Sequence, residues 1–154
     1  MQTIAPLDAK SVAALYDTDL YAWANTNADL LRKGKYEQID VAHLIEEIED
    51  MGKNDQRSLA SHLRNLLMHL LKWQYQPDIR SQSWQSSVIN ARLEIEQLLK
   101  DSPSLGVKLP KVMATEYAAA RRLASVETRL PIKAFPADCS YDLHDILNQD
   151  WLPQ

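Results

Sequence analysis

Four side chains could supply acid–base or metal-ligand chemistry if the fold brings them together. They are two carboxylates and two imidazoles: Glu49, His62, His69 and Glu116. Carboxylate oxygens and imidazole nitrogens are common metal ligands, and both groups serve as general acids and bases near neutral pH. The chain therefore contains the parts of an internal Glu/His site, although no single motif joins them.

The established motifs for such chemistry are missing from the sequence. Di-iron centres in helical bundles use Glu-x-x-His pairs, and the chain has only the reversed order in HLIE (43–46), on an outward face. It has no His-x-x-x-His pair, cysteine cluster, glycine-rich phosphate loop or GxSxG elbow. We therefore expect no metal and no cofactor, and the sequence favours a protein without catalytic activity.

The two histidines belong to a row of polar side chains beside the leucines of residues 55–76. The steps of three and four residues put the whole row on one flank of a helix: Ser58, His62, Asn65, His69, Trp73 and Gln76. The favoured interpretation is a set of half-buried, hydrogen-bonded boundary residues. The alternative is a polar seam that faces acids on a neighbouring helix.

Glu116 is the acid whose position is least expected. Helical spacing places it among Leu109, Met113, Ala120 and Leu123, at the centre of an apolar face. Since glutamate is almost never buried without a partner, Glu116 should pair with His62, His69 or Arg92, or have a raised pKa. We favour a structural ion pair over an active site. Glu49 lies at the edge of its own apolar stripe.

A second candidate surface is the corner in PDIRSQSW, with Arg80 and Trp84, next to Trp73. One interpretation is a capping serine followed by a tryptophan that anchors the core, so that Trp84 is largely buried and Trp73 lies at a helix–helix boundary. The other is an interaction patch of Trp73, Arg80 and Trp84, because arginine and tryptophan dominate binding hot spots.

Helical periodicity covers most of the chain, and no strand pattern occurs. A first helix begins in the acidic run at residues 17–19 and ends at Gly34. We expect further helices over 41–52, 55–76, 82–100, 109–129 and 141–148, with an end or kink at Gly52 and Ser140 starting the last one. The segment 41–52 has the apolar stripe Val41, Leu44, Ile45, Ile48 and Met51, which should be buried.

These elements predict an all-α fold. It is a small bundle of four to five amphipathic helices with an extended, proline-punctuated C-terminal tail and a short final helix. Residues 1–15 are expected to form a weakly ordered lead, and residues 16–154 a single domain. The stripes can be buried only if the helices pack on one another.

Composition limits the function classes. The chain has 154 residues and a formal net charge of −4, which argues against general nucleic-acid binding. Its one cysteine, Cys139, fits a reducing cytoplasm. No apolar run approaches the roughly 20 residues that cross a membrane, and the start lacks secretory-signal features. We expect a cytoplasmic protein that binds a protein partner or its own copy.

Several segments together resemble a known family. They are YDTDLYAWANTNADLLRKGKYEQID, HLIEEIEDMG, HLLKWQYQP with RSQSW, EYAAAR and FPADCSYDL. In order and wording they resemble a bacterial, largely cyanobacterial family filed as domain of unknown function 29. The resemblance implies a helical fold and no established activity. The positions that match family-like motifs are Glu46, Glu49, His69, Trp73, Arg80, Trp84, Glu116 and Tyr117.

The sequence leaves two hypotheses. The leading one is an interaction or self-association module without catalysis. The alternative is a bundle enzyme, or a ligand- or metal-binding protein, with an internal Glu/His site. Asn27, the one polar residue in the apolar stripe of the first helix, has no role assigned by sequence.

Overall fold

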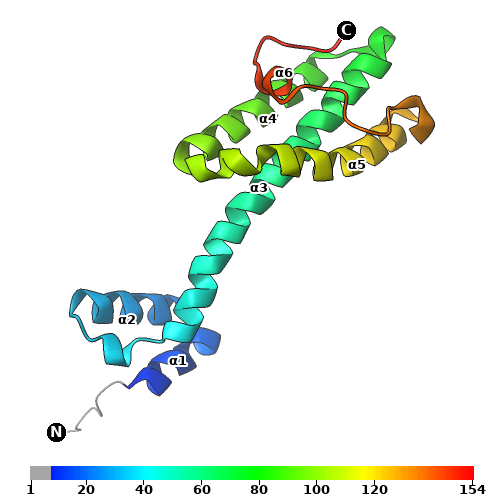
Figure 1. Cartoon of the computed structure of the whole chain (residues 1–154). Helices are drawn as coiled ribbons and strands as arrows, with labels where there is room; N and C mark the ends of the chain where they lie inside the picture. Colours follow the sequence, from blue (N-terminus) through cyan, green and yellow to red (C-terminus); the bar gives the residue numbers. More distant parts are fainter. Residues whose placement is uncertain (1–7) are drawn as a thin grey trace, which may run out of the picture. The chain divides into compact units, whose positions relative to one another are not determined.

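The computed structural model describes residues 8–154, which form six α-helices joined by short 3-10 turns (Figure 1). The described chain contains no β-strand, so the predicted all-α fold is confirmed. Across residues 8–154, no helix combines the length and the apolar character needed to cross a membrane. The chain packs as two compact units that meet in sequence at Lys53 and Asn54.

The first unit contains α1 (Ala9–Thr18), α2 (Leu20–Arg32), a 3-10 turn (Tyr36–Gln38) and the beginning of α3 (Val41–Tyr75). Its core is small and consists of Val12, Trp23, Leu30 and Ile39, with Leu15, Tyr16 and Leu44 packed against them. Asp19 caps α2 by accepting a hydrogen bond from the backbone N–H of Ala22 at 2.9 Å. The predicted acidic start is thus confirmed.

The N-terminal segment differs from the expected lead. Helix α1 (Ala9–Thr18) begins within the segment expected as a weakly ordered lead, with Asp8 accepting a hydrogen bond from the backbone N–H of Ser11 at 2.8 Å. Residues 1–7 lie outside the described residues. At the other end of α2, Gly34 has a φ of 68°, a left-handed conformation that glycine adopts without strain, so the predicted stop is confirmed.

The second unit contains the rest of α3 with α4 (Gln82–Asp101), α5 (Leu109–Thr128) and α6 (Leu143–Leu147). Ser81 caps α4 through the backbone N–H of Trp84, as expected of a serine in the PDIRSQSW corner, and Pro110 lies in the first turn of α5. The leucines of α3 from Leu59 to Leu71 pack with Val88, Ala91 and Ile95 of α4, and with residues of α5 such as Tyr117 and Ala120.

The predicted end or kink at Gly52 is wrong, because α3 is one helix of 35 residues. Glycine inside a helix costs only about 1 kcal/mol relative to alanine. Neighbouring side chains favour continuity, since Lys53 pairs with Asp50 at 3.1 Å and with Glu49 at 3.7 Å across one helical turn. A single glycine therefore does not end this helix.

The C-terminal tail contributes more to the core than its sequence suggests. Phe135, Tyr141 and Ile146 are all buried in the core of the second unit. Helix α6 is capped by Asp142, which accepts from the backbone N–H of His144 at 2.8 Å, and Ser140 is not the cap that we expected. A carboxylate directly before the helix satisfies a free N–H group that Ser140, two residues earlier, does not reach.

The apolar stripe at the start of α3 is the largest departure from prediction. Val41, Ile45, Ile48 and Met51 are 56%, 52%, 65% and 69% exposed, and only Leu44 packs on the first unit's core. The prediction that this stripe is buried is wrong. Periodicity shows that the residues share one side of a helix, but it does not supply another element to cover that side.

Candidate functional site

Glu116 forms an ion pair, but with a partner that the sequence did not suggest. Its carboxylate accepts a hydrogen bond from Nη1 of Arg64 on α3 at 3.1 Å. The Glu116 side chain is 15% exposed and the Arg64 side chain 40% exposed. The expected partners His62, His69 and Arg92 are wrong, because Arg64 lies on the α3 face that α5 approaches and Arg92 is engaged elsewhere.

The histidines are boundary residues. Both are half-buried, and Nδ1 of His69 lies 2.9 Å from the backbone carbonyl oxygen of Asn65. Burial lowers the pKa of His69. Gln76, in the same row, donates to the backbone carbonyl of Thr128 at 3.0 Å. These contacts support the boundary interpretation of the row over a polar seam.

Glu49 belongs to the first unit and is exposed beside Lys53. Among residues 8–154, no hydrogen bond or ion pair joins Glu116 to His62 or His69, and no group of three or more His, Cys, Asp or Glu residues is arranged to hold a metal ion. An acid–base role for Glu49, His62, His69 and Glu116 remains a prediction.

The Arg–Trp corner is held together by its own contacts. Arg80 donates from Nε to the carbonyl oxygen of Trp73 at 2.8 Å, and its guanidinium carbon lies 4.9 Å from the centre of the Trp73 ring. Trp84 is half-buried, less than expected, and the ammonium of Lys72 lies 4.7 Å from its ring centre. Each tryptophan therefore has a cation on one face, in an arrangement that stabilises both side chains.

Lys72 is a buried charge that sequence reasoning missed. Its ammonium donates to the carboxylate of Glu127 on α5 and contacts the Trp84 ring. Helical spacing could have indicated that Lys72 is buried, since it follows the buried Met68 by four positions and so lies on the same side of α3. A lysine at that phase reaches the core side with its alkyl chain and needs a partner for its head group.

The first unit contains a buried polar network around Asp40, whose side chain accepts from the backbone N–H of His43 at 3.4 Å at the start of α3. Asp40 Oδ2 accepts from Trp23 Nε1 at 2.9 Å and lies 2.5 Å from His43 Nδ1. The amide of Asn27 accepts from the Asp40 backbone N–H at 3.0 Å and donates to the Trp23 carbonyl at 2.9 Å. This network gives Asn27, which had no assigned role, a structural one.

The charges of this network are set by its hydrogen bonds. Burial alone would raise the pKa of Asp40, but hydrogen bonds from Trp23 and His43 lower it below its usual value. The hydrogen bond to Asp40 raises the pKa of His43. The pair therefore favours carboxylate and imidazolium together.

Tyr16 completes the network on the α1 side. Its ring stacks on His43 with centroids 4.0 Å apart, and its hydroxyl donates to Glu47 at 2.6 Å. That hydrogen bond raises the pKa of Tyr16 to about 12. An Asp–His pair can act as a general base beside a nucleophile, but the described contacts of His43 include no hydroxyl or thiol nucleophile other than this tyrosine. The network joins α1, α2 and α3.

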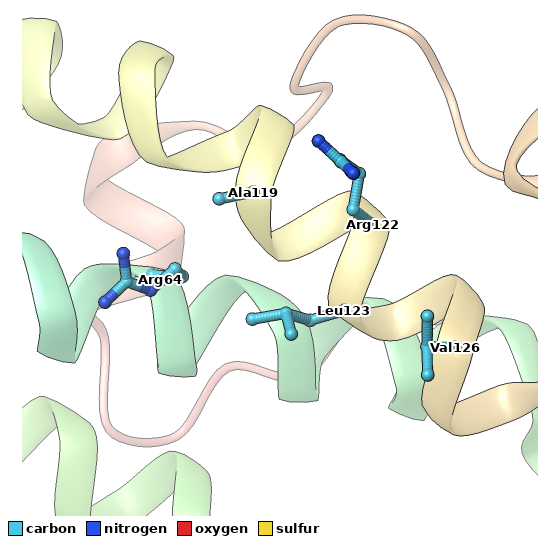
Figure 2. A pocket seen from close by; sticks show the side chains of 5 residues that line it. All are labelled: Arg64, Ala119, Arg122, Leu123 and Val126. Carbon is cyan, nitrogen blue, oxygen red and sulfur yellow. The ribbon is translucent and has the colours of Figure 1, made fainter.

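A shallow groove of about 440 Å³ lies on the second unit. Figure 2 shows its lining, with Ala119, Arg122, Leu123 and Val126 on α5 and Arg64 on the neighbouring helix α3. Leu123 and Val126 are 42% and 75% exposed. The groove therefore combines an apolar floor with two guanidinium groups, a combination that suits a protein surface better than a small buried substrate.

Comparison with known proteins identifies a family. A family model described as Domain of unknown function DUF29 matches residues 15–152, nearly the whole chain, so the chain belongs to that family. No curated protein and no solved structure matches the chain. The family description names no activity.

Proposed function

We propose that this member of the DUF29 family is a non-catalytic interaction module that self-associates through the start of α3. The observation that carries the proposal is the row of Val41, Ile45, Ile48 and Met51, called here the α3 stripe, each more than half exposed. Single exposed apolar residues are ordinary, but a continuous apolar row on one helix side is typical of an interaction surface.

The geometry of the α3 stripe suits a partner helix. Its members are spaced by four, three and three residues, so they lie on one side of the helix over about three turns. Amphipathic helices bind each other through rows with this spacing. A partner that covers the α3 stripe would remove four large apolar side chains from water, which is the main driving force of association.

The rest of α3 supports this use of the row. Leu59 follows Ile48 by eleven residues, close to three turns, and so continues nearly the same side of the helix. Leu59, Leu63 and Leu66 on that side are fully buried against other helices. The same side of α3 is thus buried along one part of the helix and exposed along another. This is the pattern expected of a helix surface that packs against a second protein chain.

The other candidate surfaces have weaker support. The corner of Trp73, Arg80 and Trp84 remains a proposed interaction patch, but its cations already contact its own rings. Of the acid–base residues of the alternative enzyme, Glu116 and His69 are bonded to Arg64 and to the Asn65 carbonyl, and Glu49 is exposed beside Lys53. We place the module in the cytoplasm of a bacterium, in keeping with its single cysteine.

The test is sedimentation equilibrium of the full chain across micromolar concentrations. We expect the wild type to form dimers and Ile48→Glu to remain monomeric, because a charge on the α3 stripe opposes its burial. Val107→Glu is the matched control, since Val107 is 87% exposed and lies on a 3-10 segment outside α3.

Circular dichroism should show unchanged helix content in both variants. A wild type that stays monomeric throughout, or an Ile48→Glu dimer as stable as the wild type, would contradict the proposal.

A further inference from the structure

We infer that the α3 stripe of one copy docks on the outer side of α5 in a second copy. This α5 face consists of Ala119, Arg122, Leu123 and Val126, which line the groove in Figure 2. The inference rests on the proposed function, because it names the surface that receives the α3 stripe. Both surfaces are present in every copy, so the contact can form between two identical chains.

The apolar parts of the two surfaces match in kind and length. The α5 face has steps of three, one and three residues, which place it along one side of α5 over about two turns. The exposed side chains of Leu123 and Val126 and the small Ala119 leave room for large side chains of a facing helix. Ile45 and Ile48 are of suitable size to fill such a groove.

The charged side chains of α5 differ in whether they are paired. Both acids of the helix pair with α3, Glu116 with Arg64 and Glu127 with Lys72. Lys111 and Arg122, in contrast, form no ion pair within residues 8–154. Two further bases flank the helix, Lys108 before it and Arg129 after it. Both acids lie close to Leu123 at the edge of the α5 face and are paired, so the charged groups on this side of α5 without an ion-pair partner are basic.

The first unit has the opposite charge. Residues 8–53 contain ten acidic and five basic side chains, a formal net charge of −5, whereas residues 54–154 contain eleven acidic and twelve basic side chains, a net charge of +1. Exposed Glu49 lies at the edge of the α3 stripe and shares one base, Lys53, with Asp50. Asp50 and Glu46 are exposed on the side of the helix opposite Ile48.

The α3 stripe and the acids of its helix are thus complementary to the α5 face of a second copy, which has apolar side chains and unpaired basic groups. Charge complementarity of this kind directs association and fixes which surfaces meet. Glu49, next to Ile48 along α3, is the acid best placed to meet Arg122 of the second copy.

The first experiment locates the contact directly. A photoreactive benzoylphenylalanine replaces Ile48 in the full chain, and ¹⁵N-labelled and unlabelled copies are mixed before irradiation. We expect mass spectrometry to show cross-links between differently labelled copies that end within residues 119–126. Cross-links to residues 41–51 of the other copy would overturn this inference and leave the proposed function intact. Cross-links confined to one copy, or no cross-linked dimer, would overturn both.

The second experiment reverses the charges. We expect Arg122→Glu and Glu49→Lys each to weaken dimerisation about tenfold at low salt and the double variant to recover most of the loss. Lys133→Glu is the control, since Lys133 is exposed and lies outside α5. If neither single variant weakens the dimer, or the double variant does not recover it, the inference fails. Loss of dimer in Ile48→Glu alone would keep the proposed function.

Discussion

The side-chain oxygen of Asn27 accepts a hydrogen bond from the backbone N–H of Asp40 at 3.0 Å, and this bond ties the middle of α2 to the start of α3. Asn27 is fully buried among apolar side chains, and its amide nitrogen is satisfied by the Trp23 carbonyl. One residue thus places the capping carboxylate of Asp40 where Trp23 and His43 can bind it.

Asn27→Ala should destabilise the first unit by ~1–3 kcal/mol, because the buried N–H of Asp40 would lose its acceptor. The direct measurement is amide hydrogen exchange at Asp40, which should become faster. Asn25→Ala is a matched control, since Asn25 makes the same bond to the carbonyl four residues earlier but is exposed. Equal effects of the two substitutions would contradict a special role for Asn27.

The Asp40–His43 pair predicts how stability depends on pH. The raised pKa of His43 stabilises the fold fully below the unfolded value of about 6.5, and this contribution is lost as pH rises through the folded value. The lowered pKa of Asp40 contributes above its unfolded value of about 3.9 and is lost as pH falls through the folded value. The pair is therefore most stabilising between these limits.

The test is urea unfolding of the wild type and His43→Gln from acid to mildly alkaline pH. The advantage of the wild type should be present at mildly acid pH and shrink above neutrality. The acids that act on His43 are Asp40, Glu46 and Asp17, and each of them raises the pKa of His43, so they do not reverse the sign. The other three histidines are common to both proteins. A difference that grows with rising pH would refute the pairing.

The free energy of unfolding should fall by different amounts when Lys72 or Glu127 is replaced. Glu127→Gln leaves a buried ammonium without a counter-charge and should cost ~1–3 kcal/mol. Lys72→Met should be close to neutral, because the Glu127 side chain is 43% exposed and water can solvate its carboxylate. Denaturant unfolding of both variants measures the asymmetry.

Glu116→Gln provides the comparison for this pair. Since Arg64 is partly exposed, its guanidinium can be hydrated when the carboxylate is lost, and the cost should be only ~0.2–1 kcal/mol. A larger loss for Glu116→Gln than for Glu127→Gln would mean that the Arg64 pair is the more deeply buried one.

Arg92 should hold the C-terminal segment in place. This buried guanidinium donates to the backbone carbonyls of Ile146 at 2.7 Å, Gln149 at 3.4 Å and Trp151 at 2.8 Å. Arg92→Met should leave these acceptors unpaired, cost ~1–3 kcal/mol and speed proteolysis after residue 146. Arg92→Lys should lower stability less than Arg92→Met but should not restore the wild-type value, because an ammonium lacks the planar set of donors of a guanidinium. Unchanged proteolysis in Arg92→Met would disprove the role.

Much of the local structure could be predicted from sequence. The acidic run at residues 17–19 and the serine of the PDIRSQSW corner marked the starts of two helices, and Gly34 marked the end of one, because caps and breakers act over one or two turns. The pairing of Glu116 followed from its position on an apolar face, since a buried carboxylate needs a partner whichever fold contains it. The expected end or kink at Gly52 was wrong, because the free-energy cost of one glycine in a helix is smaller than the stabilisation gained from a continuous helix.

Tertiary structure alone decided which surfaces meet. Periodicity placed Val41, Ile45, Ile48 and Met51 on one side of a helix, but whether that side is covered depends on elements far away in sequence. The same reason explains why Arg64 pairs with Glu116, why Lys72 reaches Glu127, and why Arg92 binds the carbonyls of the C-terminal segment. Each contact joins residues more than fifty positions apart, and only the packed helices bring them within bonding distance.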